Sequence, residues 1–457
     1  MTMDRRTLLA AGTGLGLIAT AAADAVAGPR TVHALEPGAP DRKTVETKLQ
    51  AGSDEDQTAA LQAAIDGAAL QGEPLHLPAG TLRTRSLNLP AGLKLTGANG
   101  LSVLQFIGGA TFISARDASS LTLQDIVFDG AMLPLDAEQG DALVYLENCK
   151  NVTLLRVEVR HALLNGISLQ GCSGRISDCT ITTASQAIYS NNASGLEIVH
   201  NRISGCRNNG ILVWRDTPGE DGTIVALNRI EGIDARIGGT GEYGNGVNVF
   251  RANGVLVTSN RISDCAYSAV RGNAASNIQI TSNSCARLGE VAIYAEFGFE
   301  GAVIANNTVV TAATGISVTN FNEGGRLAVV QGNLIRNLFK RENEPEDKRG
   351  EGITIEADTL VSNNVIENAP TCGILIGWGE FMRDCMVTQN LLRATRVGIL
   401  VSSGSPTGKA LISGNMISAS KEGAIRMMTL GVPEGPDLTK AGSIADARLV
   451  IAGNTST

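Results

Sequence analysis

The sequence predicts an all-β protein, a single-stranded right-handed parallel β-helix with an N-terminal capping helix. Three observations predict this solenoid. A short phrase, Asn-x-Ile followed by a polar link and Gly-Ile-x-Val, recurs at intervals of 23 to 32 residues within the stretch 152–417. The apolar runs in the phrase are short, alternate, and are bounded by Gly and Asn, which is typical of strands. The 53 glycines and 4% aromatic residues suit a thin coil with tight corners.

The asparagine of the phrase is predicted to be structural. It recurs at Asn201, Asn228, Asn260, Asn283, Asn307, Asn333, Asn364, Asn390 and Asn415. Asparagine tolerates the left-handed backbone conformation of a sharp bend, and its amide can bond to the same residue in the next coil. We therefore expect these residues at the bends, stacked in a ladder. A leucine-rich repeat is disfavoured because its Leu-x-x-Leu-x-Leu frame is missing, and a propeller needs longer units with hairpin turns.

Residues 1–27 are predicted to be an export signal. Arg5 and Arg6 precede a mild apolar run that ends near Ala23, and Ala25-Val26-Ala27 has the form of a cleavage site. Paired arginines are typical of a twin-arginine signal, and a plain secretory signal is the alternative. The mature chain is then expected in the periplasm or outside the cell, with the twin-arginine translocase as its partner during export. No stretch of the mature chain is apolar enough to span a membrane.

Residues 28–53 are interpreted as a linker, and residues 54–457 as the β-helix domain. A helix is predicted at about 56–70, because Leu61, Ile65, Ala68 and Ala69 share one face and Gly72 stops the helix. The open apolar end of a β-helix must be covered, and an amphipathic helix can cover it.

The run from Gln57 to Gly97 resembles the N-terminal part of pectate-lyase-like β-helix proteins, in which a capping helix precedes two Leu-Pro-Ala-Gly corners. The later repeats resemble those of NosD and of carbohydrate-binding and hydrolase β-helices. The Asp-Arg-Arg-Thr-Leu-Leu start resembles a family of twin-arginine-translocated repeat proteins. This resemblance covers nearly the whole chain and implies fold and export, with no established activity. The polygalacturonase Asn-Thr-Asp, Asp-Asp and Gly-His-Gly motifs and the alginate epimerase Asp-Pro-His-Asp motif are missing, so no catalytic residue is carried over.

The eight cysteines are predicted to be buried thiols. They are Cys149, Cys172, Cys179, Cys206, Cys265, Cys285, Cys372 and Cys385. Cys206 and Cys265 occupy the same inward slot of the phrase, where a small apolar side chain fits. A disulfide between neighbouring coils stays open, because an oxidising compartment permits one.

Composition also limits cofactors and partners. The net charge of −8 argues against nucleic acid, which needs a basic face. The four histidines are scattered and no Cys-x-x-Cys is present, so zinc is not expected. No cofactor is predicted. Calcium binding among the acidic loops is possible, but no loop has a ligand spacing that predicts it.

Strand alternation predicts two outward columns of side chains along one face, because each x of Gly-Ile-x-Val-x points away from the core. Tyr189, Trp214 and Phe250 fall in these columns and are predicted to bind substrate, since exposed aromatic rings stack on sugars. The same columns hold four candidate catalytic residues, Arg271, Tyr294, Glu296 and Glu356. A polysaccharide or glycan is therefore the expected partner.

Two mechanisms fit these four residues. Arg271 and Tyr294 are one coil apart and can serve as base and acid in β-elimination from a uronate, as in a lyase. Glu296 and Glu356 are two coils apart, a backbone separation of about 9.6 Å. This separation overlaps the carboxylate spacing of an inverting glycoside hydrolase. Whether the protein is an enzyme or only a binder is left open.

Three longer links, at 214–222, 232–244 and 338–350, enter the same region. They can wall a groove, which supports glycan binding, or fold over the face and seal it. A sealed face favours the alternative function, a non-catalytic periplasmic scaffold that binds other proteins. The mixed charge run at 340–349 is interpreted as a solvated loop. The oligomeric state is not predicted.

Overall fold

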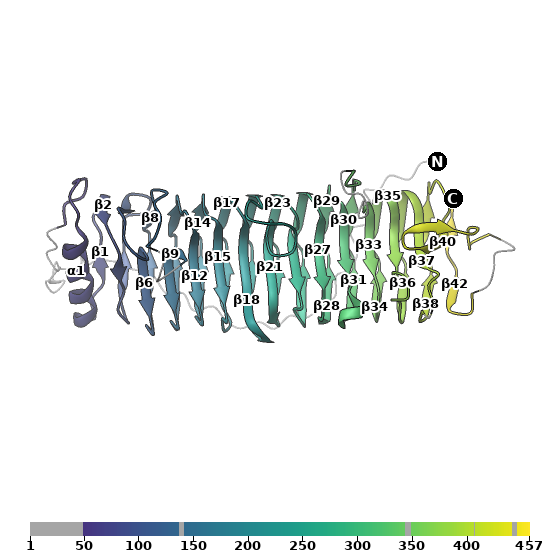
Figure 1. The fold of residues 1–457 in the computed structure, drawn as a ribbon, viewed down its shortest axis with the longest axis horizontal. Helices are drawn as coiled ribbons and strands as arrows, with labels where there is room; N and C mark the ends of the chain where they lie inside the picture. Colours follow the sequence, from purple (N-terminus) through teal and green to yellow (C-terminus); the bar gives the residue numbers. More distant parts are fainter. Residues whose placement is uncertain (1–48, 137–140, 343–348, 406, 441–445) are drawn as a thin grey trace, which may run out of the picture. The chain divides into compact units, whose positions relative to one another are not determined.

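A computed structural model describes residues 49–136, 141–342, 349–405, 407–440 and 446–457. These residues form stacked coils of parallel strands with one helix at the N-terminal end (Figure 1), and they lie within one compact unit, Val45–Thr457. The predicted export signal and most of the predicted linker lie outside the described residues. Within the described residues, no helix has the length and apolar character needed to cross a membrane.

Helix α1 (Thr58–Gln71) confirms the predicted capping helix. Its first turn is anchored by Asp56, whose carboxylate accepts the backbone N–H of Thr58 at 2.9 Å. It buries Leu61, Ala64, Ile65 and Ala68 against the first coils. Ala69, expected on this face, is half-buried, and Ala64 takes its place. Gly72 ends the helix with φ 67°, a left-handed conformation that glycine adopts without a steric cost.

The first face of the coils is a fifteen-stranded parallel sheet. Its strands, in spatial order, are β1 (Leu75–His76), β4 (Lys94–Thr96), β7 (Thr122–Gln124), β10 (Val152–Leu155), β13 (Gly174–Ser177), β16 (Glu197–Val199), β19 (Ile224–Ala226), β22 (Leu256–Thr258), β25 (Ile278–Thr281), β28 (Glu300–Ala305), β31 (Arg326–Gln331), β34 (Thr359–Ser362), β36 (Cys385–Thr388), β38 (Ala410–Ser413) and β42 (Leu449–Ala452).

The second face follows the first, and from β7 onwards a two-residue bend joins the two strands of each coil; the links in the first two coils are three and five residues long. Its strands are β2 (Gly80–Thr84), β5 (Ser102–Phe106), β8 (Val127–Asp129), β11 (Glu158–Arg160), β14 (Thr180–Thr182), β17 (Arg202–Cys206), β20 (Arg229–Ile233), β23 (Arg261–Cys265), β26 (Ser284–Leu288), β29 (Thr308–Val310), β32 (Leu334–Arg336), the first halves of β35 (Val365–Ile376) and β37 (Leu391–Ser402), β39 (Met416–Ser418) and β43 (Thr455–Ser456).

The third face carries the Gly-Ile-x-Val runs. Its strands are β3 (Leu87–Asn88), β6 (Ile113–Arg116), β9 (Ala142–Glu147), β12 (Asn165–Gln170), β15 (Gln186–Asn191), β18 (Asn209–Glu220), β21 (Asn245–Asn253), β24 (Val270–Asn273), β27 (Val291–Glu296), β30 (Thr314–Val318), β33 (Glu351–Ile355), the second halves of β35 and β37, and β40 (Ile425–Thr429). Strand β41 (Val432–Glu434) pairs antiparallel with β40 at the C-terminal end.

One difference concerns the predicted link at 214–222. Strand β18 runs on to Glu220 and pairs with β21, with a register shift between Trp214 and Gly219. Most of this link is therefore an extension of the third face. The link at 232–244 leaves the coils as predicted, as do the described ends of the link at 338–350.

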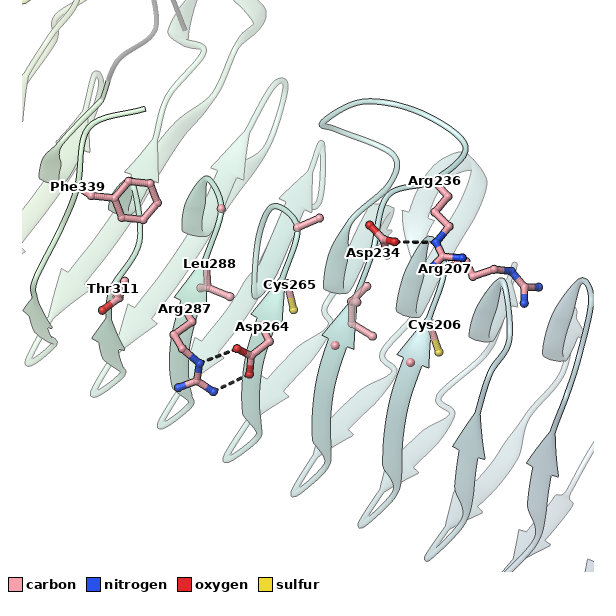
Figure 2. A pocket seen from close by; sticks show the side chains of 15 residues that line it. Cys206, Arg207, Asp234, Arg236, Asp264, Cys265, Arg287, Leu288, Thr311 and Phe339 are labelled. Atoms are coloured by element: carbon pink, nitrogen blue, oxygen red, sulfur yellow. Dashed lines mark hydrogen bonds and ion pairs between the residues drawn. The ribbon is translucent and has the colours of Figure 1, made fainter. Parts of the chain in front are cut away.

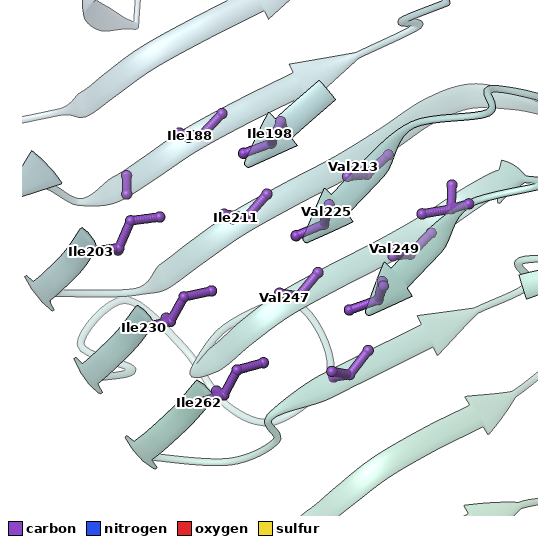
Figure 3. Close-up of a cluster of buried hydrophobic side chains, with 14 of the residues drawn as sticks. Ile188, Ile198, Ile203, Ile211, Val213, Val225, Ile230, Val247, Val249 and Ile262 are labelled. Atoms are coloured by element: carbon purple, nitrogen blue, oxygen red, sulfur yellow. The ribbon is translucent and has the colours of Figure 1, made fainter. Parts of the chain in front are cut away.

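The core is a column of branched apolar side chains that all three faces point into (Figure 3). Ile188, Ile211 and Val247 come from neighbouring strands of the third face and lie directly above one another. Ile203, Ile230 and Ile262 from the second face meet them, and each of the six is at most 1% exposed. Burying one such side chain stabilises the fold by about 1.5–3 kcal/mol. The repeated Ile and Val positions of the sequence are therefore the interior of the coil.

The asparagine ladder is confirmed. The side-chain amide of Asn260 donates to Oδ1 of Asn283 at 3.0 Å, and the backbone N–H of Asn260 donates to the same oxygen at 3.0 Å. The same pattern joins all nine predicted asparagines and continues to Asn454, which was not among the predicted ones.

The expectation that these asparagines adopt the left-handed conformation is wrong. The residue before each asparagine has positive φ instead, as at His200 (60°), Ser259 (57°) and Asn363 (57°). The bend is made by that preceding residue. The asparagine itself turns inward, where its amide satisfies backbone groups that the bend leaves without strand partners.

The eight cysteines are free and buried, which confirms the predicted thiols. Cys206 and Cys265 lie in one inward row, separated by Ile233 in the coil between them. Burial raises the pKa of Cys206, Cys285 and Cys385 to about 12. These thiols therefore stay protonated and act as small apolar side chains.

Candidate functional site

The two outward columns predicted on the third face exist. The strand register places one residue of the first column in each coil: Ser168, Tyr189, Leu212, Asn248, Arg271, Tyr294, Ser317, Thr354, Leu375, Leu400 and Arg426. The second column follows through Asn191, Trp214, Phe250, Asn273 and Glu296. All seven predicted site residues therefore lie on one face.

Tyr189, Trp214 and Phe250 form an aromatic ladder on three successive coils. The ring centroids of Trp214 and Phe250 are 4.1 Å apart, and those of Tyr189 and Trp214 are 6.5 Å apart with the planes at 77°. The Arg251 guanidinium lies 4.7 Å from the Phe250 centroid. All three rings are half-buried, because each covers its neighbour. Less of each ring is therefore open to solvent than the exposed rings predicted from the sequence.

Arg271 is the centre of a buried ion cluster. Its Nε and Nη2 donate to the two carboxylate oxygens of Glu296 at 2.6 and 2.9 Å. Its Nη1 donates to Thr240 Oγ1 at 2.9 Å and lies 3.6 Å from Glu290. The guanidinium also lies 4.5 Å from the centroid of the Tyr294 ring. Arg271 is thus held by four residues and is only 6% exposed.

Two of the long links cover this cluster. Thr240, in the link at 232–244, bonds to both Arg271 and Glu290. Arg349, at the end of the link at 338–350, donates to Glu290 at 3.1 Å, and Arg341 lies 3.7 Å from the same carboxylate. The interpretation of 340–349 as a wholly solvated loop is therefore wrong at both of its described ends.

Arg271 and Tyr294 were predicted to be exposed, but these contacts bury both side chains. Tyr294 is 6% exposed and lies between the guanidinium groups of Arg271 and Arg349. Burial raises the pKa of Tyr294 well above the usual value of a phenol. A phenol that is both buried and hard to ionise is poorly suited to act as the base of an elimination.

Beyond the covered cluster, the same face opens into a cavity of about 360 Å³, which we call the Glu356 pocket. Glu356 and Glu296 line it from coils two apart, with Thr319 between them. The hydroxyls of Ser317 and Thr354 form its floor, 3.0 Å from each other. The pocket therefore combines hydroxyl and carboxyl groups, which suit the hydroxyls of a sugar.

Two exposed aromatic side chains line the same pocket. Trp378 is 44% exposed and Phe297 is 40% exposed. Trp378 follows directly on the third-face part of β35, and its backbone pairs with Phe381 in a short bridge that fixes the turn. Large apolar rings beside convergent polar groups are the usual composition of a ligand site.

The two carboxyl groups of the pocket have perturbed acidity. Burial raises the pKa of Glu356, and the backbone N–H of Phe321, which donates to its Oε2 at 2.7 Å, partly offsets the shift. Burial also raises the pKa of Glu296, against the opposing effect of the Arg271 guanidinium. Among the described residues, no cation pairs with Glu356 as Arg271 pairs with Glu296, so Glu356 is the better candidate for a carboxyl group that holds a proton.

Another cavity lies elsewhere, at the corner between the second and third faces (Figure 2). It has a volume of about 640 Å³ and a floor of buried Cys206, Cys265 and Leu288. Its acidic residues are paired with arginines: Asp264 with Arg287 and Asp234 with Arg236. These partners lower the pKa of both aspartates. The cavity therefore offers no carboxyl group poised for proton transfer, and none of the predicted site residues lines it.

Metal ligands do not converge in the part of the chain that the structure describes. No group of three or more His, Cys, Asp or Glu side chains there is arranged to hold an ion.

Sequence comparison matches residues 141–324, and a second time residues 219–392, to the family described as the right handed beta helix region. The chain belongs to this family. The two matches together span most of the coils that carry the aromatic ladder, the ion cluster and the Glu356 pocket. No protein of curated function matches the sequence.

Solved β-helix structures share the fold at low sequence identity. An alginate lyase, AlyF-OU02 in complex with G6, aligns with a TM-score of 0.53 at 14% identity, covering 89% of this chain and 94% of the lyase. The catalytic unit of a GH87 α-1,3-glucanase from Streptomyces thermodiastaticus aligns with a TM-score of 0.51 at 14% identity, covering 92% and 69%.

The N-terminal fragment of the bacteriophage Phi29 gene product 12 aligns with a TM-score of 0.51 at 15% identity. The alignment covers 90% of this chain but 65% of that fragment, less than two thirds of its length. At such identities these likenesses show that the β-helix fold is shared.

The sequence pattern placed Glu296, Glu356 and Tyr294 at the pocket but missed Trp378 and Phe297. Both follow directly after the last outward position of a coil, at Gly377 and Glu296. The alternation of the strand therefore does not mark these two positions. The available signal was that Trp378 is one of only two tryptophans in a chain poor in aromatic residues.

The raised pKa of Glu356 predicts a stability change on substitution. Between its usual value of 4.5 and the higher value in the folded state, the folded protein holds a proton that the unfolded chain releases. The free energy of unfolding therefore falls as pH rises through this window. We expect Glu356→Gln to raise Tm at pH 7 and to lose this advantage below pH 4.5. Thermal melts across pH measure this, with exposed Glu220→Gln as the control. An equal response of both variants would contradict it.

Proposed function

We propose that this β-helix protein binds a glycan in the Glu356 pocket. The observation that carries the proposal is the pairing of exposed Trp378 and Phe297 with a hydroxyl-lined cavity of about 360 Å³. Aromatic rings supply stacking surface for the apolar face of a sugar, and the hydroxyls of Ser317 and Thr354 supply donors and acceptors for its edge. The coils hold both sets of groups on a rigid scaffold.

The aromatic ladder is proposed as a second contact region. Phe250 and Glu296 lie two coils apart in the second column, about 9.6 Å between backbones, with Asn273 between them. A glycan of several sugar units is long enough to reach from the pocket towards Trp214 and Tyr189. The alginate lyase and the glucanase that share the fold act on polysaccharides by name, which is consistent with a glycan ligand.

Glycoside hydrolysis is the second candidate, and the raised pKa of Glu356 favours it. A carboxyl group that keeps its proton can act as the acid on the leaving oxygen, with Glu296 as the base. Arg271 donates to both oxygens of Glu296, which makes this carboxylate a poor base. Binding without catalysis is therefore the function that the geometry supports best. The lyase assignment of Arg271 and Tyr294 is disfavoured by their burial.

A direct experiment separates these functions. The purified protein is incubated with a panel of neutral and uronate polysaccharides, and reducing and unsaturated ends are measured alongside binding by calorimetry. We expect binding without new ends. New reducing ends that disappear in Glu356→Gln would establish the hydrolase, whereas the absence of both binding and activity would favour the protein-binding scaffold.

Trp378 is expected to contribute a large part of the affinity. Its ring is exposed in the pocket, so Trp378→Ala removes stacking area without opening the core. We expect at least about tenfold weaker binding, which corresponds to about 1.4 kcal/mol. Trp378→Phe keeps an aromatic face and should stay within about threefold of the unsubstituted protein. Equal affinity of the alanine variant would place the ligand elsewhere.

We also propose that the protein is exported by the twin-arginine route, on the basis of Arg5, Arg6 and the apolar run that follows. The lysine double variant Arg5→Lys/Arg6→Lys should leave the precursor in the cytoplasm of a host that has this pathway. Cell fractionation followed by immunoblotting measures the distribution. Undiminished export of the double variant would favour a plain secretory signal.

A further inference from the structure

The outer surface of the first face carries a continuous apolar stripe. From β19 onwards, the strand register aligns one outward residue per coil: Ile224, Leu256, Gln279, Val303, Val329, Leu360, Met386, Leu411 and Val450. Gln279 is the one polar member. Before β19, the same column holds the ion-paired Arg175 and Glu197, so the stripe has a definite N-terminal limit.

The column beside the stripe is also free of charge. Its outward residues are Ala226, Thr258, Thr281, Ala305, Gln331, Ser362, Thr388, Ser413 and Ala452. Charged residues occur along the border where the strands begin, as the ion pairs Glu300–Arg326 and Asp358–Arg383. An uncharged centre with a charged border is the usual composition of a protein–protein interface.

Every member of the stripe is at least partly exposed in the single chain. Val303 is 37% exposed, Met386 42% and Val450 57%. Around the bend, the second face adds exposed Leu334, Val365, Leu391 and Met416 on coils of the same C-terminal half. Monomeric proteins seldom expose so long a contiguous apolar surface, and one of this extent marks a site of association.

We propose that two copies of this chain pair face to face through the apolar stripe. Both copies have the same rise per coil, so the side-chain rows of one copy match the spaces between the rows of the other. A two-fold axis across the stripe makes the contact self-complementary, as in most homodimers. A membrane is a poorer partner for this surface, because binding to anionic lipid needs basic residues beside the apolar ones.

A hollow in the stripe supports a protein partner. It has a volume of about 310 Å³ and lies between β25, β28 and β31, where it is lined by Val303, Ala302 and Val329. Leu327 stands at its border, 50% exposed, with φ 68°. The hollow is near the middle of the stripe. A two-fold axis there brings the partner's Leu327 close to this hollow, as a projecting side chain that can fill it.

The area is sufficient for a stable contact. Eight coil steps of about 4.8 Å make the stripe about 38 Å long. Together with the uncharged column beside it, the stripe forms a surface about 14 Å wide, with a projected area of about 500 Å². Projecting side chains and the charged border add to this flat area, so the surface buried per partner approaches the roughly 800 Å² of a standard interface. The proposal does not depend on the glycan site, which lies on the third face.

Analytical ultracentrifugation of the purified protein from about 1 to about 100 µM tests this proposal. We expect a dimer at the upper concentrations. For Val303→Asp we expect a dimer Kd at least about 100-fold higher, because the substitution places a charge at the centre of the contact. Leu164→Asp, on a residue that is 41% exposed outside the stripe, is the matched control and should remain dimeric.

Met386→Asp is a second variant on the stripe, and Tm is measured for each protein so that loss of the dimer is separated from loss of the fold. Monomeric Val303→Asp and Met386→Asp variants with an unchanged Tm support the proposal. A monomeric unsubstituted protein at every concentration overturns it, as does a dimer that persists in both folded variants. Glycan binding by a monomeric variant is expected to be unchanged.

Discussion

Replacing Asn283 with alanine is expected to lower the free energy of unfolding by about 3–6 kcal/mol, because three hydrogen bonds between buried polar groups are lost. Oδ1 of Asn283 accepts the backbone and side-chain N–H groups of Asn260, each at 3.0 Å. Its Nδ2 donates to the carbonyl of Val257 at 3.0 Å. Each group left unmet inside the coil costs about 1–3 kcal/mol. Urea unfolding followed by circular dichroism measures the change.

Asn454→Ala is the matched control for this substitution. Asn454 ends the ladder and makes the equivalent bonds to Asn415 and Ile412, but it is only partly buried. Water can replace its lost bonds, so we expect a clearly smaller loss. If both variants lost the same stability, burial would not be what makes the ladder strong. If Asn283→Ala lost less than about 1 kcal/mol, the ladder would not be a main stabilising feature.

Arg271→Ala is expected to lower the free energy of unfolding by about 3–5 kcal/mol at pH 7, because it leaves the buried Glu296 carboxylate without its cation. Glu296 loses two hydrogen bonds, at 2.6 and 2.9 Å, and Tyr294 loses the cation over its ring. Arg271→Lys should recover only part of the loss, since lysine cannot bond to both oxygens in the same way. The measurement is denaturant unfolding at several pH values.

The double variant Arg271→Ala/Glu296→Gln distinguishes a structural from a catalytic role. Removing both charges leaves no uncompensated carboxylate at this position, so most of the lost stability should return. The single Arg271→Ala variant should also be less impaired at acidic pH, where Glu296 can take up a proton. A stable Arg271→Ala protein that has lost only activity on a glycan would restore Arg271 as a catalytic residue.

The coils could be predicted from sequence because their causes are local. Gly-Ile-x-Val fixes which residues point inward, and this alternation survives changes in link length. Asn454 was missed because 39 residues separate it from Asn415, including the antiparallel hairpin of β40 and β41. The position of the bend was assigned one residue too late, since the pattern identifies a conspicuous asparagine and cannot show which of two adjacent residues has positive φ.

The exposure of the candidate site could not be predicted in the same way. Whether Arg271 is open to solvent depends on Thr240 and, through Glu290, on Arg349, which lie 31 residues from Arg271 and 59 residues from Glu290 along the chain. Contacts of this kind leave no periodic signal. The pocket lies on the coils of β27, β30 and β33, with Arg349 of one covering link in its lining. Its aromatic side chains stand just outside the repeating positions.

Tryptophan fluorescence tests the proposed glycan site most directly, because the chain has two tryptophans and Trp214→Phe leaves Trp378 as the sole reporter. Titration of this variant with the oligosaccharides that bind in the calorimetric panel should give a saturable change in emission, with the same Kd as calorimetry. The reciprocal variant, Trp378→Phe, should still bind but show a smaller change, reported by Trp214. A ligand that binds with unchanged Trp378 emission would contradict the assignment of the Glu356 pocket as the glycan site.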